Sequence, residues 1–145
     1  MSISFNSYRT FPCDHSDMKL GYIIIYVENV PETVAFYQRA FDLQVRFVHE
    51  STLYAEMETG QTALAFSAIE DVVANGIAAS PNRLDQLPGA FEICLVNKDV
   101  QGVFDQAVQN GCVPLMNPTE KPWGQVVAYV RDLNGCLIEL ASPVG

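Results

Sequence analysis

The stretch GYIIIYVENVPETVAFYQRAF, residues 21–41, decides the fold because it joins a strand pattern to a helix pattern. Residues 22–27 are all apolar or aromatic, so both faces of the expected strand are predicted to be buried. The segment 31–41 opens with Pro31, which the first turn of a helix tolerates because its missing N–H costs little there. We therefore predict a strand followed by an amphipathic helix that packs on the sheet through Val34, Tyr37 and Phe41.

The stretch FEICLVNKDVQGVFDQAVQNG, residues 91–111, repeats this pattern 70 positions later. A gapless shift by 70 residues places Ile23 on Ile93 and Val34 on Phe104. Further strand patterns follow each helix, at 44–50, 52–58 and 62–68 in the first half and at 112–116, 125–131 and 136–142 in the second. Each half is therefore predicted to run strand, helix and three strands.

Turn and loop residues separate these strands. Glu58-Thr59-Gly60 marks a turn in the first half, and Asp132-Leu133-Asn134-Gly135 marks one in the second, ending in the hairpin signal Asn-Gly. Between the halves, residues 67–90 form a polar stretch punctuated by proline and glycine. We expect this stretch to link the halves or to cover one end of a site.

Length and composition describe one ordinary domain, because 145 residues with 49% apolar side chains can supply a core. The net charge of −9 argues against nucleic acid and against anionic membrane surfaces as partners. The apolar runs are too short to cross a bilayer, and residues 1–17 lack the pattern of a signal peptide, so we predict a cytoplasmic protein. An acidic surface suits a cationic ligand, and equally suits solubility alone.

The four cysteines include no CxxC pair. Cys94, Cys112 and Cys136 lie among apolar neighbours, so we predict buried, reduced thiols rather than a disulfide framework.

Three stretches resemble a known family: YIIIYVENVPETVAFYQRAF, EICLVNKDVQGVFDQAV and above all PWGQVVAYVRDLNGCLIELAS. They are similar to the vicinal oxygen chelate superfamily of glyoxalases, bleomycin-resistance proteins and ring-cleaving dioxygenases, over roughly residues 19–142. The resemblance implies an α+β fold in which two βαβββ modules form a cupped mixed sheet around a cleft.

The same resemblance sets the expected boundaries. Residues 1–17 are an N-terminal extension and residues 18–145 are one glyoxalase/bleomycin-resistance-like domain. Within it we expect module one at about 19–68, a linker at about 69–90 and module two at about 91–142.

Members of the family that do chemistry hold a divalent metal on the first and last strands of each module. By resemblance these positions fall on Tyr22 and Ala65 in module one and on Glu92 and Glu139 in module two. We expect no bound cofactor, because a methyl group and a phenol are poor ligands. The alternative is a hard ion, Mg²⁺ or Mn²⁺, held by the two glutamates.

Histidine ligands are excluded by counting. The chain has two histidines, His15 in the extension and His49 on an expected second strand, so two module-related histidines cannot be supplied. Without a metal, Glu92 and Glu139 would face a shared cleft, where like charges raise one pKa and yield a proton donor beside an acceptor. The same pair could bind a ligand amine, or be satisfied by local donors with no chemical role.

The leading functional prediction is a small-molecule-binding protein of the bleomycin-resistance type. Its cationic or amphiphilic ligand would lie in an acidic, aromatic-lined cleft formed by Tyr22, Tyr26, Glu92, Trp123 and Glu139. The alternative is a glyoxalase-like lyase or isomerase with Glu92 and Glu139 as catalytic residues. We also expect a homodimer, because the family commonly builds its clefts with help from a second subunit.

Overall fold

The computed structural model describes residues 17–144, and every structural statement below refers to that range. Apart from Asp17, the expected N-terminal extension lies outside the described residues, and Cys13 and His15 lie outside with it.

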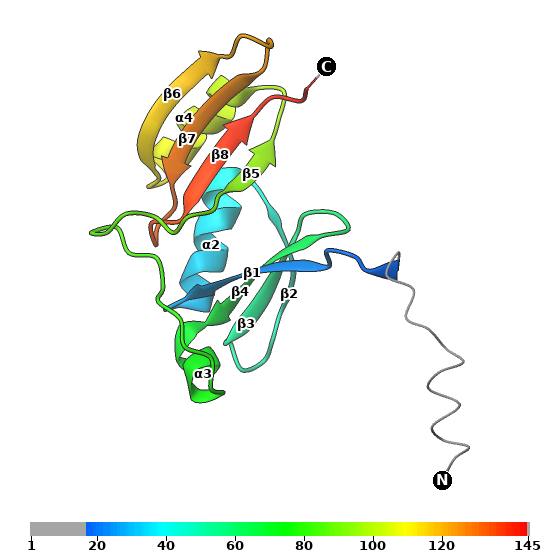
Figure 1. Cartoon of the computed structure of the whole chain (residues 1–145), viewed down its shortest axis with the longest axis vertical. Coiled ribbons are helices and arrows are strands. Elements are labelled where there is room, and N and C mark those ends of the chain that lie inside the picture. The colour runs from blue at the N-terminus through cyan, green and yellow to red at the C-terminus, as the bar shows by residue number, and fades with distance from the viewer. Residues whose placement is uncertain (1–16, 145) are drawn as a thin grey trace, which may run out of the picture.

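The chain forms two βαβββ modules, as predicted (Figure 1). Module one contains β1 (Tyr22–Val27), α2 (Val30–Phe41), β2 (Gln44–Val48), β3 (Tyr54–Glu58) and β4 (Ala63–Ala68). Module two contains β5 (Ile93–Val96), α4 (Val100–Gln109), β6 (Val113–Glu120), β7 (Val126–Arg131) and β8 (Leu137–Ala141). The linker between them begins with the short helix α3 (Ile69–Ala74).

Each module builds a four-stranded mixed sheet with the same topology. The strand orders are β1-β4-β3-β2 and β5-β8-β7-β6, with the first strand parallel to the last and the remaining pairs antiparallel. The two sheets lie apart and do not close into one cup within the chain (Figure 1).

The sequence repeat extends to the way each helix begins. The side chain of Asn29 accepts a hydrogen bond from the backbone N–H of Glu32 at 2.9 Å, and 70 residues later Asp99 accepts one from Gly102 at 2.9 Å. A side-chain oxygen at this position satisfies an N–H that has no partner inside the helix. The two helices therefore start at matching positions in the two modules.

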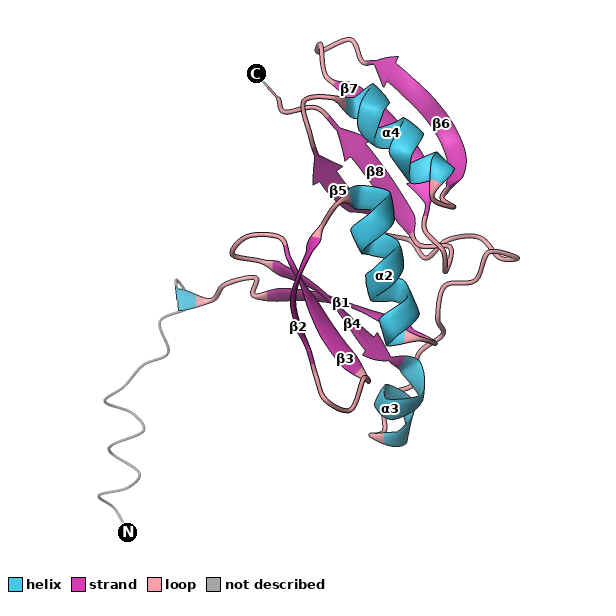
Figure 2. Cartoon of the chain, turned by 180° about the vertical axis from the view of Figure 1, so that it is seen from behind, coloured by secondary structure: helices cyan, strands magenta, loops and turns pink. Residues whose placement is uncertain are grey.

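Each helix lies against one face of the sheet of its own module, and the two helices contact each other (Figure 2). α2 packs on β3 and β4, and α4 packs on β6, β7 and β8. Val34, Tyr37 and Phe41 are buried against the module-one sheet, which confirms the predicted apolar side of the helix.

The face of each sheet that points away from its helix is called here its open face. On β1 the helix side is buried, with Ile25 5% exposed, whereas Tyr22 and Ile24 on the open face are 54% and 45% exposed. The prediction that both faces of this strand are buried is therefore wrong, because each module has one long helix and that helix covers one face.

The junction between the modules depends on Asp132, in the turn between β7 and β8. Asp132 is 1% exposed and accepts hydrogen bonds from the Tyr37 hydroxyl at 2.5 Å and from the backbone N–H groups of Asn134 and Cys136, both at 2.9 Å. Burial raises the pKa of Asp132, although its hydrogen bonds oppose this, and burial also raises the pKa of Tyr37. Asn134 donates to the Thr33 hydroxyl at 3.1 Å, so the predicted hairpin turn also docks on α2 of module one.

The linker is held at the same place by Arg131. Its guanidinium donates to the carbonyls of Gly135, Arg83 and Gln86 at 2.8–2.9 Å. Gly135 has φ +96°, and a Cβ there would lie 2.6 Å from Arg131 Nη2, so this turn needs glycine. The linker therefore runs against the hairpin of module two.

The structure tests the predicted burial of Cys94, Cys112 and Cys136. Cys112 and Cys136 are buried free thiols, as expected, but Cys94 is exposed because it lies on the open face of β5.

No helix between residues 17 and 144 is long and apolar enough to span a membrane.

Candidate functional site

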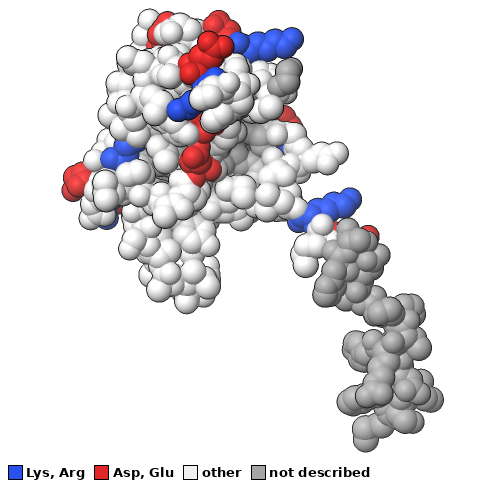
Figure 3. Space-filling model, turned by 45° about the horizontal axis from the view of Figure 1, so that its top comes forward, with Lys and Arg blue, Asp and Glu red and all other residues white. Residues whose placement is uncertain are grey.

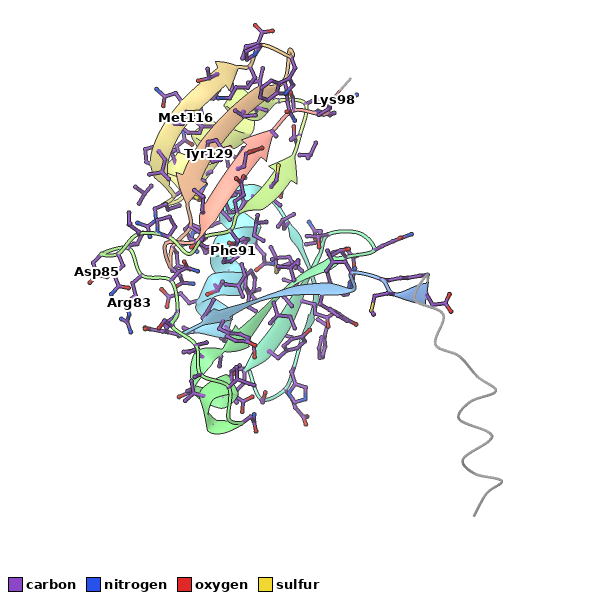
Figure 4. The ribbon with its side chains drawn as sticks, in the orientation of Figure 1. Arg83, Asp85, Phe91, Lys98, Met116 and Tyr129 are labelled. Carbon is purple, nitrogen blue, oxygen red and sulfur yellow. The ribbon has the colours of Figure 1, made fainter. Side chains whose placement is uncertain are left out.

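The open face of module two carries a row of polar side chains across three strands. Glu139 lies in the middle of β8, opposite Cys94 on β5 and Tyr129 on β7. Its Oε1 accepts a hydrogen bond from the Tyr129 hydroxyl at 2.6 Å, and its Oε2 accepts one from the Cys94 thiol at 3.3 Å. Figure 4 shows Tyr129 on this face, with Met116 on the neighbouring strand β6.

Glu92 completes the row just before β5. Burial raises its pKa, and the hydrogen bond to Glu139 and the charge of Glu139 raise it further. For Glu139, burial raises the pKa, but hydrogen bonds from Tyr129, Cys94 and Glu92 outweigh it, so the pKa is lowered. The opposite shifts mean that Glu139 loses its proton at a lower pH than Glu92 does, so the first negative charge of the pair forms on Glu139.

The two donors to Glu139 stay protonated at neutral pH. The pKa of Cys94 is raised to about 12, first by burial and then by Glu139. The pKa of Tyr129 is also raised, mainly by its hydrogen bond to Glu139. Because the thiolate is the reactive form of cysteine, Cys94 acts here as a hydrogen-bond donor and not as a nucleophile.

Module one presents a different open face at the corresponding positions. Ala65 pairs with Ile24 on β1 and with Glu56 on β3, so a methyl group stands where module two has Glu139. Tyr22 and Tyr26 lie on β1 of this sheet. The structure thus brings Glu92 and Glu139 together and places the two tyrosines on the other module.

Two carboxylates on the module-one sheet, Glu56 and Glu58, are paired with a cation. Arg46 binds Glu58 with both ends of its guanidinium, at 2.8 and 2.6 Å, and lies 3.8 Å from Glu56. Glu56 also accepts a hydrogen bond from the Tyr54 hydroxyl at 2.9 Å. These acids are satisfied inside the chain.

Trp123 lies in the loop between β6 and β7 and is 65% exposed. Its indole N–H donates to Gln125 Oε1 at 2.9 Å, and Gln125 donates to the Ser142 carbonyl at 2.8 Å, which fixes the loop to the end of β8. The charge of Lys121 in the same loop helps to lower the pKa of Glu139. The loop therefore acts electrostatically on the site, and the indole ring is open for stacking.

The four positions implied by resemblance do not fit a metal centre. Ala65 offers no ligand atom, both oxygens of Glu139 accept hydrogen bonds, and Tyr22 lies on the other module. Among residues 17–144, no three His, Cys, Asp or Glu side chains are grouped so as to hold an ion. We therefore derive no chemistry through a metal.

Sequence reasoning missed Cys94 and Tyr129. Cys94 follows Glu92 by two residues, so strand alternation places it on the same side. The hairpin at Asp132–Gly135 sets the register that puts Tyr129 opposite Glu139. Both residues could have been found by extending the alternation outward from the two glutamates.

Comparisons with known proteins agree with this architecture. The sequence profile described as Glyoxalase/Bleomycin resistance protein/Dioxygenase superfamily matches residues 19–140. No curated protein sequence matches the chain.

Three solved structures illustrate the likeness. A glyoxalase-related enzyme from Fulvimarina pelagi has a TM-score of 0.74 at 18% identity, covering 87% of this chain and 88% of that chain. TioX from Micromonospora sp. ML1 has a TM-score of 0.66 at 17% identity, covering 86% and 98%. A glyoxalase/bleomycin resistance protein/dioxygenase family enzyme from Burkholderia phytofirmans PsJN has a TM-score of 0.64 at 20% identity, with the same coverages of 86% and 98%. At these identities the likeness concerns the fold. Because the family profile spans most of the sequence, the chain belongs to the glyoxalase/bleomycin resistance protein/dioxygenase superfamily.

Proposed function

We propose that the chain binds a small cationic organic molecule on the open face of module two, with its positive charge facing Glu139. The observation that carries the proposal is the state of this carboxylate. The pKa of Glu139 is lowered from 4.5, so this side chain is a carboxylate at neutral pH. Among residues 17–144 the ion pairs are Arg46–Glu56, Arg46–Glu58 and Arg83–Glu28, so Glu139 has no ion-pair partner there. A cationic ligand would supply the missing charge.

Neighbouring features support a cation with a flat apolar part. The exposed indole of Trp123 and the ring of Tyr129 offer surfaces that attract cations. On the face shown in Figure 3, acidic and basic side chains are interspersed and wide areas carry no charge. The support therefore comes from the local geometry at Glu139, to which the net charge of −9 adds only a general attraction.

Isothermal titration calorimetry with matched probes tests the proposal. Benzyltrimethylammonium and benzamidine are expected to bind, whereas their neutral counterparts benzyl alcohol and benzamide are not. Glu139→Gln should weaken binding tenfold or more, about 1.4 kcal/mol, with near-neutral stability. The matched control is Glu58→Gln in module one, which should leave binding unchanged.

Two results would contradict the proposal. Equal binding of the neutral probes would show that charge is irrelevant. If Glu92→Gln and Glu139→Gln each lost about 3 kcal/mol of stability and bound the cations as wild type does, the two carboxylates would be a structural pair.

A homodimer is part of the same proposal. Tyr22 and Ile24 on the open face of module one and Val96 and Met116 on that of module two are 38–61% exposed, and exposed apolar surface of this kind marks interaction sites. If the module-one face of a second copy covers the module-two face, Tyr22 and Tyr26 meet Glu92 and Glu139. Sedimentation equilibrium is expected to show a dimer that Ile24→Glu dissociates; a wild-type monomer would refute this part.

A second candidate function is favoured by the opposite pKa shifts of the two acids. Glu92, whose pKa is raised, could act as the acid and Glu139, whose pKa is lowered, as the base of a lyase or isomerase that moves a proton beside a carbonyl group. Exchange of the α-protons of a small hydroxyketone in D₂O, followed by NMR, tests this. The exchange should follow a bell-shaped pH profile and be lost in Glu139→Gln; exchange no faster than in buffer would exclude it.

A further inference from the structure

A cavity of about 830 Å³ lies between the two modules, at the free edge of β5. Its walls come from both modules: Phe41, Leu43 and Leu64 from module one, and Phe91, Leu95 and Val103 from module two. Figure 4 shows Phe91 at this junction. The volume lies within the range of about 300–1,000 Å³ typical of small-molecule sites, which are mostly apolar with a few polar groups.

The cavity reaches the acid cluster of module two. Glu92 and Cys94 line it, although Glu139 and Tyr129 do not. A molecule in the cavity can therefore place one end beside Glu92 while the rest of it lies between the modules.

The charged groups that line the cavity are all acidic. They are Glu92 and Asp42, and none of the lining residues within 17–144 is a lysine, arginine or histidine. Asp42 follows α2 with φ +55°, in the left-handed region, which aspartate tolerates better than most residues. An apolar interior with carboxylates on its wall is complementary to a molecule with an apolar body and a positive head.

We infer that this inter-module cavity binds the apolar chain of an amphiphilic cation whose head lies beside Glu92 and Glu139. The inference rests on the proposed function for the charged head only; the apolar body is carried by the cavity itself. It narrows the ligand class from small cations in general to amphiphilic ones.

Titration of the full chain with alkyltrimethylammonium ions, from methyl to decyl and below their micelle concentrations, tests the inference. Each methylene buried in an apolar site is expected to strengthen binding about fourfold, until the cavity is filled and the affinity levels off. Alkyl sulfates of the same lengths, with the opposite charge, should not bind.

Two wall substitutions give the matched variants. Val103→Phe fills the cavity from α4, and Leu43→Phe fills it from module one, so the inference does not depend on one variant folding. Each substitution should weaken the binding of decyltrimethylammonium tenfold or more and leave the binding of tetramethylammonium unchanged, with the thermal unfolding transition of the protein retained. Glu139→Gln should weaken the binding of both ions, because it removes the carboxylate that faces their charged head group.

The outcomes separate the two proposals. Suppose that cation binding depends on Glu139 but is unaffected by alkyl chain length, by Val103→Phe and by Leu43→Phe. This result overturns the cavity inference and leaves the proposed function standing. Chain-length-dependent binding of alkyl sulfates overturns the preference for cations. A dimer that Val103→Phe dissociates would show that a second copy occupies the cavity, and would also overturn the inference. If no alkyltrimethylammonium ion binds, the cavity inference fails; the proposed function then fails only if benzamidine does not bind either.

Discussion

The open faces of the two modules share a backbone and differ in charge. Where module two has Glu139 on its last strand, module one has Ala65, and where module two has Tyr129, module one has Glu56. The acid of module one lies on the third strand and is neutralised by Arg46, whereas the acid of module two lies at the centre of the sheet with two neutral donors. The repeated scaffold thus holds one face whose acid is paired with Arg46 and one face whose central acid has no ion-pair partner among residues 17–144.

The largest expected difference in stability cost between matched substitutions of the two modules lies in the turns before their last strands. Asp132→Ala should cost about 3 kcal/mol or more, because it leaves the Tyr37 hydroxyl and two backbone N–H groups without their acceptor. Thr59→Ala, in the matching turn of module one, removes local hydrogen bonds to Thr62 and Leu64 and should cost about 1 kcal/mol. Urea denaturation measures both; equal losses would contradict the role of Asp132 as the junction.

The next largest effect on stability is expected from substituting Ala65 and Glu139, the central residues of the two open faces. Ala65→Glu places a carboxylate directly across from Glu56 at a site that is fully buried, and should cost about 2 kcal/mol through crowding and charge repulsion. Glu139→Ala should cost about 1 kcal/mol, and Ala65→Ser is the control for size. If Ala65→Glu were as stable as wild type and bound benzamidine on module one, the modules would be interchangeable.

The opposite pKa shifts of Glu92 and Glu139 predict two opposing effects of pH on stability. The pKa of Glu92 is raised above 4.5, so its contribution to stability is fully present below pH 4.5 and is lost as pH rises through the raised pKa. The lowered pKa of Glu139 acts in the opposite sense: its contribution is present above pH 4.5 and is lost as pH falls through the lowered pKa.

Glu92→Gln keeps residue 92 neutral at every pH and should remove the decline in protein stability that ionisation of Glu92 causes above pH 4.5. The slope of the unfolding free energy against pH, measured by urea denaturation, reports it. The effect is expected to be small, because the pair is partly in solvent. Identical slopes for wild type and variant would show that the two acids titrate independently.

The smallest expected effect concerns the thiol beside Glu139. Cys94 is exposed but has a pKa of about 12, so iodoacetamide should alkylate it slowly at pH 8. Glu139→Gln removes the charge that opposes the thiolate and should speed the reaction severalfold, as followed by mass spectrometry of the Cys94 peptide. Buried Cys112 is the internal control. Alkylation of wild type as fast as that of a free thiol would contradict the hydrogen bond to Glu139.

Most of the fold could be predicted because it depends on local patterns. The strand–helix repeat and the matched positions Asn29 and Asp99 follow from the 70-residue sequence register. Leu64 and Ile138 occupy equivalent positions, since each pairs with the first strand of its module, at Ile23 and Ile93. The end of β6 was misjudged, since the prediction stopped at residue 116 and the strand runs to Glu120. β6 is an edge strand whose pairing is irregular near Pro114 and before Thr119, and edge strands tolerate proline.

The site could be predicted in part, because strand alternation shows which residues share a face but not what covers that face. The positions of Glu92 and Glu139 are implied by the family resemblance, while the exposure of Tyr22 and Ile24 depends on α2 covering only the opposite side. The cavity between the modules depends on how they dock, through a contact such as Tyr37 with Asp132, which lie 95 residues apart. No local pattern encodes such a contact.

The bond between Tyr37 and Asp132 also makes the two halves of the chain non-interchangeable. The residue of module two that corresponds to Tyr37 is Ala107, which is fully buried and has no hydroxyl to offer. Two copies of the second half would therefore bury an aspartate without its phenol, and two copies of the first half would bury a phenol without its aspartate. If the chain arose by duplication of a single ancestral module, this asymmetric contact was acquired after the copies were joined, and it now makes each half depend on the other.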